Sequence, residues 1–187
     1  MTNILFVTEK YIKENSGLND NVFGKNLLPA MMEAQDIFLQ QIIGTTLYDK
    51  LIDLVDTGEI ADDGNALYKD LLDNQIRPYL LYQTLVQLIP VINAKLVNFG
   101  TSMSNDEHLV NISQGDTVVI TGHYQNNADF YCRRLQEYIL NHCEDLDVDV
   151  CACESIRANL NSAATTGIFL GGARGRVLVK GPVSYKR

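Results

Sequence analysis

The sequence predicts an all-α fold: an antiparallel helical bundle around a buried central helix, followed by an extended C-terminal arm containing short β structure. Three observations predict it. Apolar residues recur at helical spacing up to about residue 143. One long uncharged segment is apolar in nearly every helical direction. Beyond residue 143 the helical periodicity stops. We therefore divide the chain into a helical bundle domain, 1–143, and a connector with a basic C-terminal arm, 144–187.

The composition is that of a globular protein. Of 187 residues, 46% are hydrophobic and 20% are charged, which suits one sizeable core. The first residues, MTNILFVTEK, become charged too early for a secretory signal. We therefore expect the four cysteines to be thiols in a reducing compartment.

Helix start and stop signals divide the bundle domain into six expected helices. Thr8 is a suitable N-cap for the first helix, and Ser16-Gly17 would stop it. Gly44 would end the second helix. Its expected apolar stripe contains Leu28, Met31, Phe38 and Ile42, and is widened by Leu27, Ala34, Leu39 and Ile43. The expected helices are 8–15, 26–43, 45–55, 65–72, 76–99 and 116–143.

The expected central helix, 76–99, has no charged residue between Arg77 and Lys95. A membrane span of about 20 residues is the alternative interpretation. Polar residues and a proline interrupt the apolar run, however, and no second segment of similar length exists. We interpret it as a buried helix. Pro90 lies in its interior and should kink it, because proline removes one backbone hydrogen bond.

Two other segments allow more than one interpretation. The acidic run EIADDGN, 59–65, lacks the alternating aspartates and terminal glutamate of a calcium-binding EF-hand loop, so we expect a solvated connection between helices. The β-branched run TVVIT, 117–121, would suit a strand if taken alone. Because a strongly helical pattern follows it, we expect a helix from about Asp116 to Cys143, with Gly122 as a weak point.

Candidate chemistry is sparse. His142, Cys143, Cys151 and Cys153 match the number of zinc ligands, but their spacing lacks the usual pairs of close cysteines. A metal-binding or regulatory module remains the alternative function; packed side chains are the simpler interpretation. No nucleophile motif is present, and GGARG, 171–175, lacks the closing residues of a phosphate loop. We expect no enzymatic activity and no cofactor.

Charge is divided unevenly along the chain. All 23 acidic residues and nine of the 15 basic ones lie at or before Glu154, a net charge of −14. The rest of the chain has six basic residues and no acid, a net charge of +6. Nucleic-acid binding by the arm is one interpretation. We favour docking of the arm on its own body or on a neighbouring copy, since opposite charge steers such contacts.

The arm also contains two apolar runs, IFL and VLV, about a glycine-rich turn, which predicts a hairpin. An isolated hairpin is marginally stable in water, so it would need a surface to cover it. If the neighbouring copy accepts the arm head-to-tail, repetition can close into a ring. The hypothesised oligomer interface consists of Ile168, Phe169, Leu170, Arg174, Arg176, Val177, Leu178, Val179 and Lys180.

Four segments carry a resemblance to a known class of proteins: FVTEKYIKENSGLNDNV, LLPAMMEAQDIFLQQIIGTTLYDKLIDL, NNADFYCRRLQEYI and TGIFLG. The sequence resembles the head–tail connector ring, or head-completion, proteins of tailed bacteriophages, especially those of crAss-like phages. The resemblance implies a small helical bundle, without enzymatic activity, in a ring of typically twelve copies under the portal. Its neighbours would be the portal and adjacent ring or tail proteins.

The same resemblance implies a location in the neck of the virion, after assembly in the host cytoplasm, and no membrane partner. Double-stranded DNA would pass through the lumen of the ring without specific binding. An acidic wall suits this role, because negative charge repels the phosphate backbone. The resemblance implies no catalytic residues.

Overall fold

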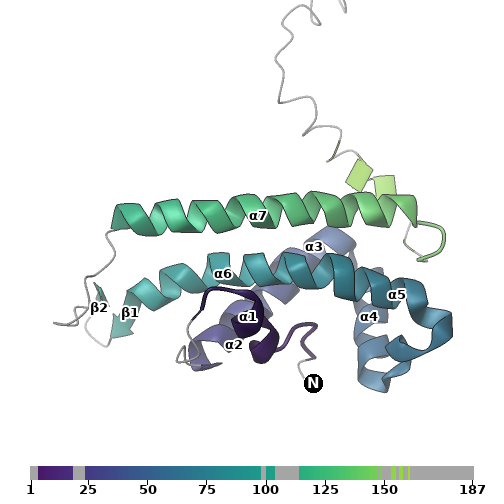
Figure 1. Ribbon diagram of the computed structural model, residues 1–187, viewed down its shortest axis with the longest axis horizontal. Helices are drawn as coiled ribbons and strands as arrows, with labels where there is room; N and C mark the ends of the chain where they lie inside the picture. The colour runs from purple at the N-terminus through teal and green to yellow at the C-terminus, as the bar shows by residue number, and fades with distance from the viewer. Residues whose placement is uncertain are drawn as a thin grey trace, which may run out of the picture.

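The computed structural model describes residues 4–18, 24–97, 100–103, 114–146, 148, 153–154, 156–157 and 160 (Figure 1). This part of the chain is predominantly helical, so the all-α prediction is confirmed. In chain order the elements are α1 (Glu9–Asn15), α2 (Gly24–Glu33), η1 (Ala34–Leu39), α3 (Gln40–Ile43), α4 (Thr45–Thr57), η2 (Glu59–Ala61), η3 (Asp63–Asn65), α5 (Ala66–Asp70), η4 (Leu71–Ile76), α6 (Arg77–Asn93), β1 (Ala94–Val97), β2 (Gly100–Met103) and α7 (Gln114–Asn141).

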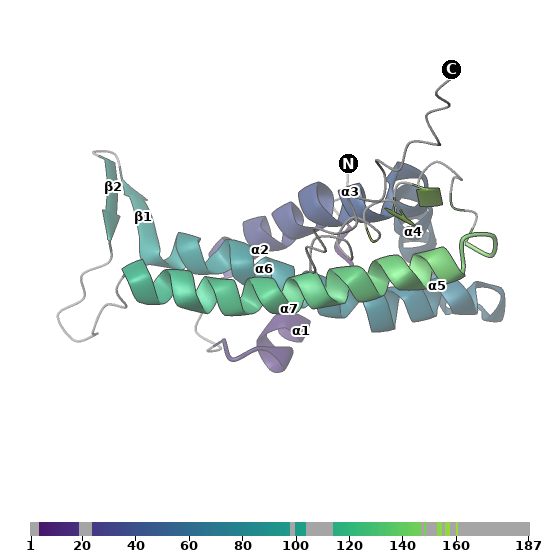
Figure 2. The ribbon, with the colours of Figure 1, turned by 90° about the horizontal axis from the view of Figure 1, so that it is seen from above.

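Two of the long helices are built from several elements. The first, α2–η1–α3, runs from Gly24 to Ile43, and the second, α5–η4–α6, from Ala66 to Asn93; η1 and η4 are π-helical turns. We call them the first rod and the central rod. The central rod packs against the first rod and against α7, which runs antiparallel to it (Figures 1 and 2).

The central rod supplies the middle of the core, as predicted. From Tyr79 to Leu88, most side chains of α6 are buried whichever way they point. Buried side chains of the first rod, of α4 and of α7 meet them there, among them Met31, Leu51 and Leu135. A helix with little polar surface is stable only when neighbours cover several of its faces. None of the helices in the described part of the chain combines the length and apolar character needed to cross a bilayer.

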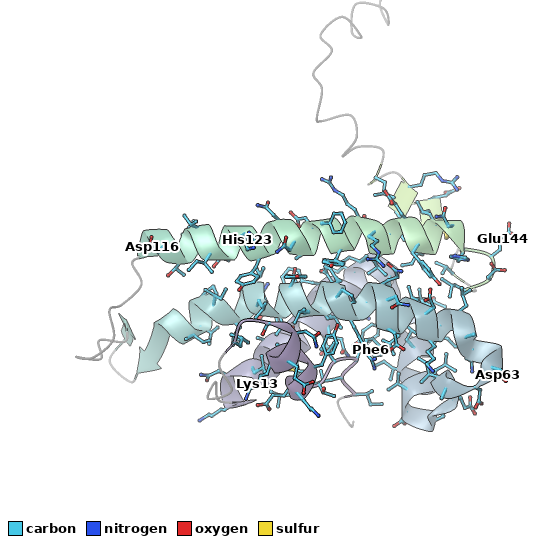
Figure 3. The ribbon with its side chains drawn as sticks, in the orientation of Figure 1. Phe6, Lys13, Asp63, Asp116, His123 and Glu144 are labelled. Atoms are coloured by element: carbon cyan, nitrogen blue, oxygen red, sulfur yellow. A yellow bond between two sulfur atoms is a disulfide. The ribbon has the colours of Figure 1, made fainter. Side chains whose placement is uncertain are left out.

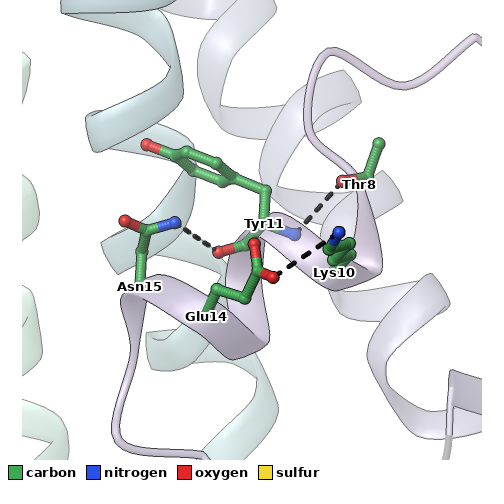
Figure 4. A network of polar contacts seen from close by, with 5 residues as sticks. All are labelled: Thr8, Lys10, Tyr11, Glu14 and Asn15. Carbon is green, nitrogen blue, oxygen red and sulfur yellow. Dashed lines mark hydrogen bonds and ion pairs between the residues drawn. The ribbon is translucent and has the colours of Figure 1, made fainter.

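Local signals fixed several helix ends where the sequence predicted them. Thr8 caps α1: its hydroxyl accepts a hydrogen bond from the backbone N–H of Tyr11 at 3.1 Å (Figure 4). On the exposed face, Lys10 pairs with Glu14, and the Asn15 amide donates to the Tyr11 carbonyl (Figure 4). Gly44 separates α3 from α4, and Gly58 closes α4 in the left-handed conformation that glycine adopts most easily. The acidic connection after Gly58 forms two exposed 3-10 turns, η2 and η3.

The predicted apolar stripe of the first rod needs a correction. Met31 is buried, but Leu28 is exposed and Phe38 and Ile42 are half-buried. Leu27, Ala34, Leu39 and Ile43, which were expected to widen the stripe, are buried, and so are Ala30 and Gln35, which were not predicted. For Phe38 and Ile42 the π-helical turn explains the difference, because its hydrogen bonds span five residues and move the residues within and after it around the helix axis.

The predicted C-terminal end of the central helix was also wrong. Helix α6 ends at Asn93, and the next residues form β1, which pairs antiparallel with β2. Ala94 faces Met103 and Val97 faces Gly100 in this register. The segment 94–97 is apolar enough for either structure, and the partner strand supplies the hydrogen bonds that favour the strand.

The core continues past the predicted domain boundary at residue 143. Leu146, Val148, Cys153 and Ile156 are buried in the same hydrophobic cluster as the helices, and Leu160 packs against it. The first described residues of the connector therefore belong to the body. This leaves the arm to begin no earlier than about residue 161.

The N-terminal segment is held to both rods by hydrogen bonds. The side chain of Gln35, which is buried, accepts a bond from the Phe6 N–H and donates one to the Ile4 carbonyl, both at 2.8 Å. Its amide also donates to the Tyr48 hydroxyl at 3.1 Å. From the central rod, the Arg77 side chain donates to the Phe6 carbonyl. Burial, followed by the hydrogen bond to Asp36, raises the pKa of Tyr48 to about 12, so its hydroxyl remains protonated.

Replacing Gln35 with leucine is expected to lower the free energy of unfolding by about 2–4 kcal/mol. Leucine is similar to glutamine in size, but it leaves the buried Phe6 N–H and the half-buried Ile4 carbonyl without their hydrogen-bond partner. Urea unfolding measures the change. Gln41→Leu is the matched control, since Gln41 is exposed on α3, and should change stability by less than about 0.5 kcal/mol. Equal effects of the two variants would contradict this role of Gln35.

Candidate interaction surface

The register between the central rod and α7 is fixed by four polar or aromatic contacts. The Tyr138 hydroxyl donates to Asp70 at 2.7 Å, and the Arg134 side chain donates to the Asn74 carbonyl at 3.3 Å. From Asp70 to Asn74 the chain advances by four residues along the central rod, while the contacting residue on α7 goes back by four, from Tyr138 to Arg134. Further along, the Tyr82 ring stacks on Tyr131 and lies beside Tyr124. The last turn of α6 is therefore next to the first turns of α7.

The contact at Asp70 has an electrostatic consequence. The hydrogen bonds from Tyr138 and Asn74 hold the pKa of the Asp70 carboxyl below its ordinary value. Burial and the same bond raise the pKa of the Tyr138 hydroxyl. The pair therefore keeps a charged acceptor and a neutral donor at neutral pH. It fastens the end of the helix pair that is far from the last turn of α6.

Exposed apolar side chains occur both on the last turn of α6 and on the first turns of α7, two stretches that the register places next to each other. The exposed fractions are 67% for Val118 and 72% for Val119, and three more apolar residues there are exposed beyond a third. We call this set the tip patch; it consists of Val91, Ile92, Val118, Val119 and Ile120. Single exposed apolar residues are common on proteins, whereas a cluster formed by two elements is typical of a binding surface.

The tip patch lies at one extreme of the molecule. Asp116 and His123 mark the start of α7 at that end, and Glu144 marks the opposite end (Figure 3). The β1–β2 hairpin directly follows α6 and projects from the same end (Figures 1 and 2). Its sheet has two strands, so within the described chain each strand has one edge without a strand partner. Such an edge can pair with another chain.

The start of α7 is also a weak helix by itself. Residues 117–121 are all β-branched, and together they lower helix stability by about 2–3 kcal/mol relative to alanine. Gly122 follows and is likewise unfavourable within a helix. Because Val118, Val119 and Ile120 point in successive directions and remain exposed, little packing offsets this cost. A partner that covers the tip patch would stabilise these turns.

The cysteines do not form the predicted set of thiols. Cys143 and Cys153 form a disulfide, with their Cα atoms 6.6 Å apart, so neither is available as a zinc thiolate. His142 instead lies beside the Tyr138 ring, tilted by 42°, and its Nδ1 is 3.6 Å from a carboxylate oxygen of Asp145. Among the described residues, no group of three or more His, Cys, Asp or Glu side chains is arranged to hold a metal ion. Cys151, the fourth residue of the predicted set, lies outside them.

The remaining thiol in the described chain, Cys132, is half-buried on α7. Burial raises its pKa to about 11, so it stays protonated and is a poor nucleophile. A surface hollow on α1 is lined by Glu9, Lys10, Lys13 and Glu14, and these charges pair within the helix. Neither feature forms a convincing chemical site.

Reduction of the disulfide is expected to lower the free energy of unfolding by about 2–3 kcal/mol, the value for closing a loop of this length in the unfolded chain. Urea unfolding with and without a thiol reductant measures it. Cys132→Ser should respond to the reductant as the unmodified protein does, and Cys143→Ser should not respond. An unmodified protein that is insensitive to reductant would show that the disulfide does not form.

The predicted oligomer-interface residues of the arm, from Ile168 to Lys180, lie outside the described residues. The tip patch was not predicted as a site. In the sequence, its residues belong to the end of the expected central helix and to the β-branched run 117–121, which suits either a strand or a helix. Their apolar character could have indicated a binding surface only if the antiparallel register of the central rod and α7 had also been known.

A family model covers more than half of the chain, matching residues 39–146. The chain belongs to the DUF6712 family. This is a family of unknown function. The DUF6712 region contains α4, the central rod, the hairpin, the whole tip patch and α7, while α1 and the basic arm lie outside it. No curated protein and no solved structure matches the chain significantly.

Proposed function

We propose that this DUF6712 protein is a non-enzymatic structural subunit of a head–tail connector in a tailed bacteriophage. In this proposal, copies form a ring that docks under the portal and extends the DNA channel toward the tail. The observation that carries it is the tip patch, a set of exposed apolar side chains on the ends of α6 and α7 at one extreme of the body (Figure 3). A subunit that functions in an assembly needs such a surface, because burial of apolar side chains drives most stable association.

Two further features support the proposal. The body up to Glu154 has a net charge of −14, which suits the wall of a channel through which DNA slides without binding. The resemblance to connector proteins of crAss-like phages includes segments of α1, of the first rod and of α7. The proposal includes an extended C-terminal arm with short β structure that completes its folding on a neighbouring subunit.

The direct test is reconstitution. Purified full-length protein is added to phage particles that contain the portal but lack the tail, and the particles are imaged by electron cryomicroscopy. The expected result is a ring of additional density beneath the portal, with rods that match the helices described above. Particles without that density would contradict the proposal, even if the free protein were monomeric. A monomer in solution is compatible with it, since the portal supplies the template.

A further inference from the structure

We propose that the tip patch and the adjoining edge of the β1–β2 hairpin receive the C-terminal arm, Ile168 to Lys180, of a neighbouring copy. The inference rests on the proposed function, and it identifies the partner of the site that carries that function. The partner is a second copy of this chain, and the part that binds is its own apolar and basic segment. Three independent observations support it.

The first observation is that the tip patch and the arm are chemically complementary. The tip patch presents branched aliphatic side chains, and the hairpin beside it has strand edges without partners in the described chain. The arm contains two short apolar runs, 168–170 and 177–179, the second of which is wholly aliphatic. A peptide of this kind binds by adding a strand to a free edge while its alternate side chains fill an apolar surface. The same contact would cover the weakly helical start of α7.

The second observation is that the arm and the body carry opposite net charges. The arm belongs to the segment after Glu154, which carries +6, whereas the body that would receive it carries −14. Asp116 lies exposed in the first turn of α7, beside the tip patch. Opposite charge accelerates the encounter of arm and body, and it disfavours the pairing of two arms with each other.

The third observation is that the arm and the tip patch belong to opposite ends of the body. The disulfide between Cys143 and Cys153 holds the chain next to the C-terminal end of α7 before the arm begins. The short described stretches 153–154 and 156–157 lie near that end in both views, far from the hairpin and the tip patch (Figures 1 and 2). A copy that gives its arm from one end and receives an arm at the other makes a head-to-tail contact. Contacts of this type close into rings when the rotation between copies permits it.

Cysteine cross-linking in the assembled particle tests the inference. Two full-length chains are prepared, one with Val119→Cys and a large tag, the other with Phe169→Cys and a small tag. Both chains carry Cys132→Ser and Cys151→Ser, so that the only cysteines besides Cys143 and Cys153 are the introduced ones. The chains are mixed, assembled on portal-containing particles and oxidised. The matched control replaces Val119→Cys with Gln41→Cys, which is exposed on α3.

The expected result is a cross-linked species that contains both tags, at least about tenfold more abundant with Val119→Cys than with Gln41→Cys, because binding holds the two thiols at high effective concentration. A ring that forms without this species would overturn the inference and leave the proposed function standing. In a chain carrying both cysteines, a link confined within one chain would also overturn it. If no ring forms on the particles, the proposed function fails, and the inference fails with it.

Discussion

Replacing Val118 and Val119 together with aspartate is expected to abolish incorporation of the protein into the connector. Both side chains are exposed in the free protein, so the change costs the fold little. Aspartate and valine have similar helix propensities, and a negative charge near the start of α7 interacts favourably with the helix dipole. In the assembly the same carboxylates would replace the aliphatic side chains that pack against the apolar runs 168–170 and 177–179 of the arm, and the cost of burying them weakens binding by about 100-fold or more. Quantifying bound protein on portal-containing particles measures the effect.

The control for this variant must add the same charge elsewhere. Gln41→Glu with Thr46→Asp adds two negative charges at exposed positions on α3 and α4, outside the tip patch. We expect this protein to bind like the unmodified one, and both variants to unfold at nearly the same temperature. Full incorporation of the Val118→Asp/Val119→Asp protein would mean that the tip patch faces solvent in the assembly.

Replacing Leu80 with alanine is expected to have the largest effect on stability, lowering the free energy of unfolding by about 3–5 kcal/mol. Leu80 is fully buried at the middle of the central rod, where the core is filled from both sides. The rods cannot close the resulting cavity without losing contacts along their length. Urea unfolding measures the loss.

Leu28→Ala is the matched comparison for Leu80→Ala, since the same atoms are removed from a side chain that is 49% exposed on α2. Its cost should be below about 1 kcal/mol. Should the two substitutions destabilise the protein equally, the central rod would not be the middle of the core.

Structural features that are determined by residues close together in the sequence were predictable. The N-cap at Thr8 and the break at Gly44 each follow from the local chemistry of one side chain, or of its absence. Burial of the central rod was also predictable, because 79–88 is apolar in most helical directions and its polar residues interrupt the run that a membrane span would need.

Features that depend on distant contacts were not predictable in this way. The π-helical turn at 34–39 changed which residues of the second half of the first rod are buried, so Gln35 faces the core while Phe38 and Ile42 are half-buried. Helix α6 ended at Asn93 because a second strand was available to pair with 94–97. Four cysteines in a sequence do not reveal which two meet, and the pairing of Cys143 with Cys153 depends on how the chain turns after α7.

The tip patch could not be predicted from the sequence for a different reason. The apolar residues of the tip patch indicate that burial is favourable, but the sequence does not say whether the chain itself supplies the cover. Only the antiparallel register of α6 and α7 showed that the two apolar ends lie together at an extreme of the molecule. Nothing in the described chain covers them there.

Hydrogen exchange at the start of α7 tests the central claim most directly. The backbone amides of residues 114–122 are measured by mass spectrometry in the free protein and in the protein bound to portal-containing particles. We expect fast exchange in the free protein, since these turns are weakly helical and exposed, and at least about tenfold slower exchange once a partner covers the tip patch. Residues 79–88 should be protected in both states. Unchanged, fast exchange at 114–122 in the bound protein would contradict the claim that the tip patch is its contact surface.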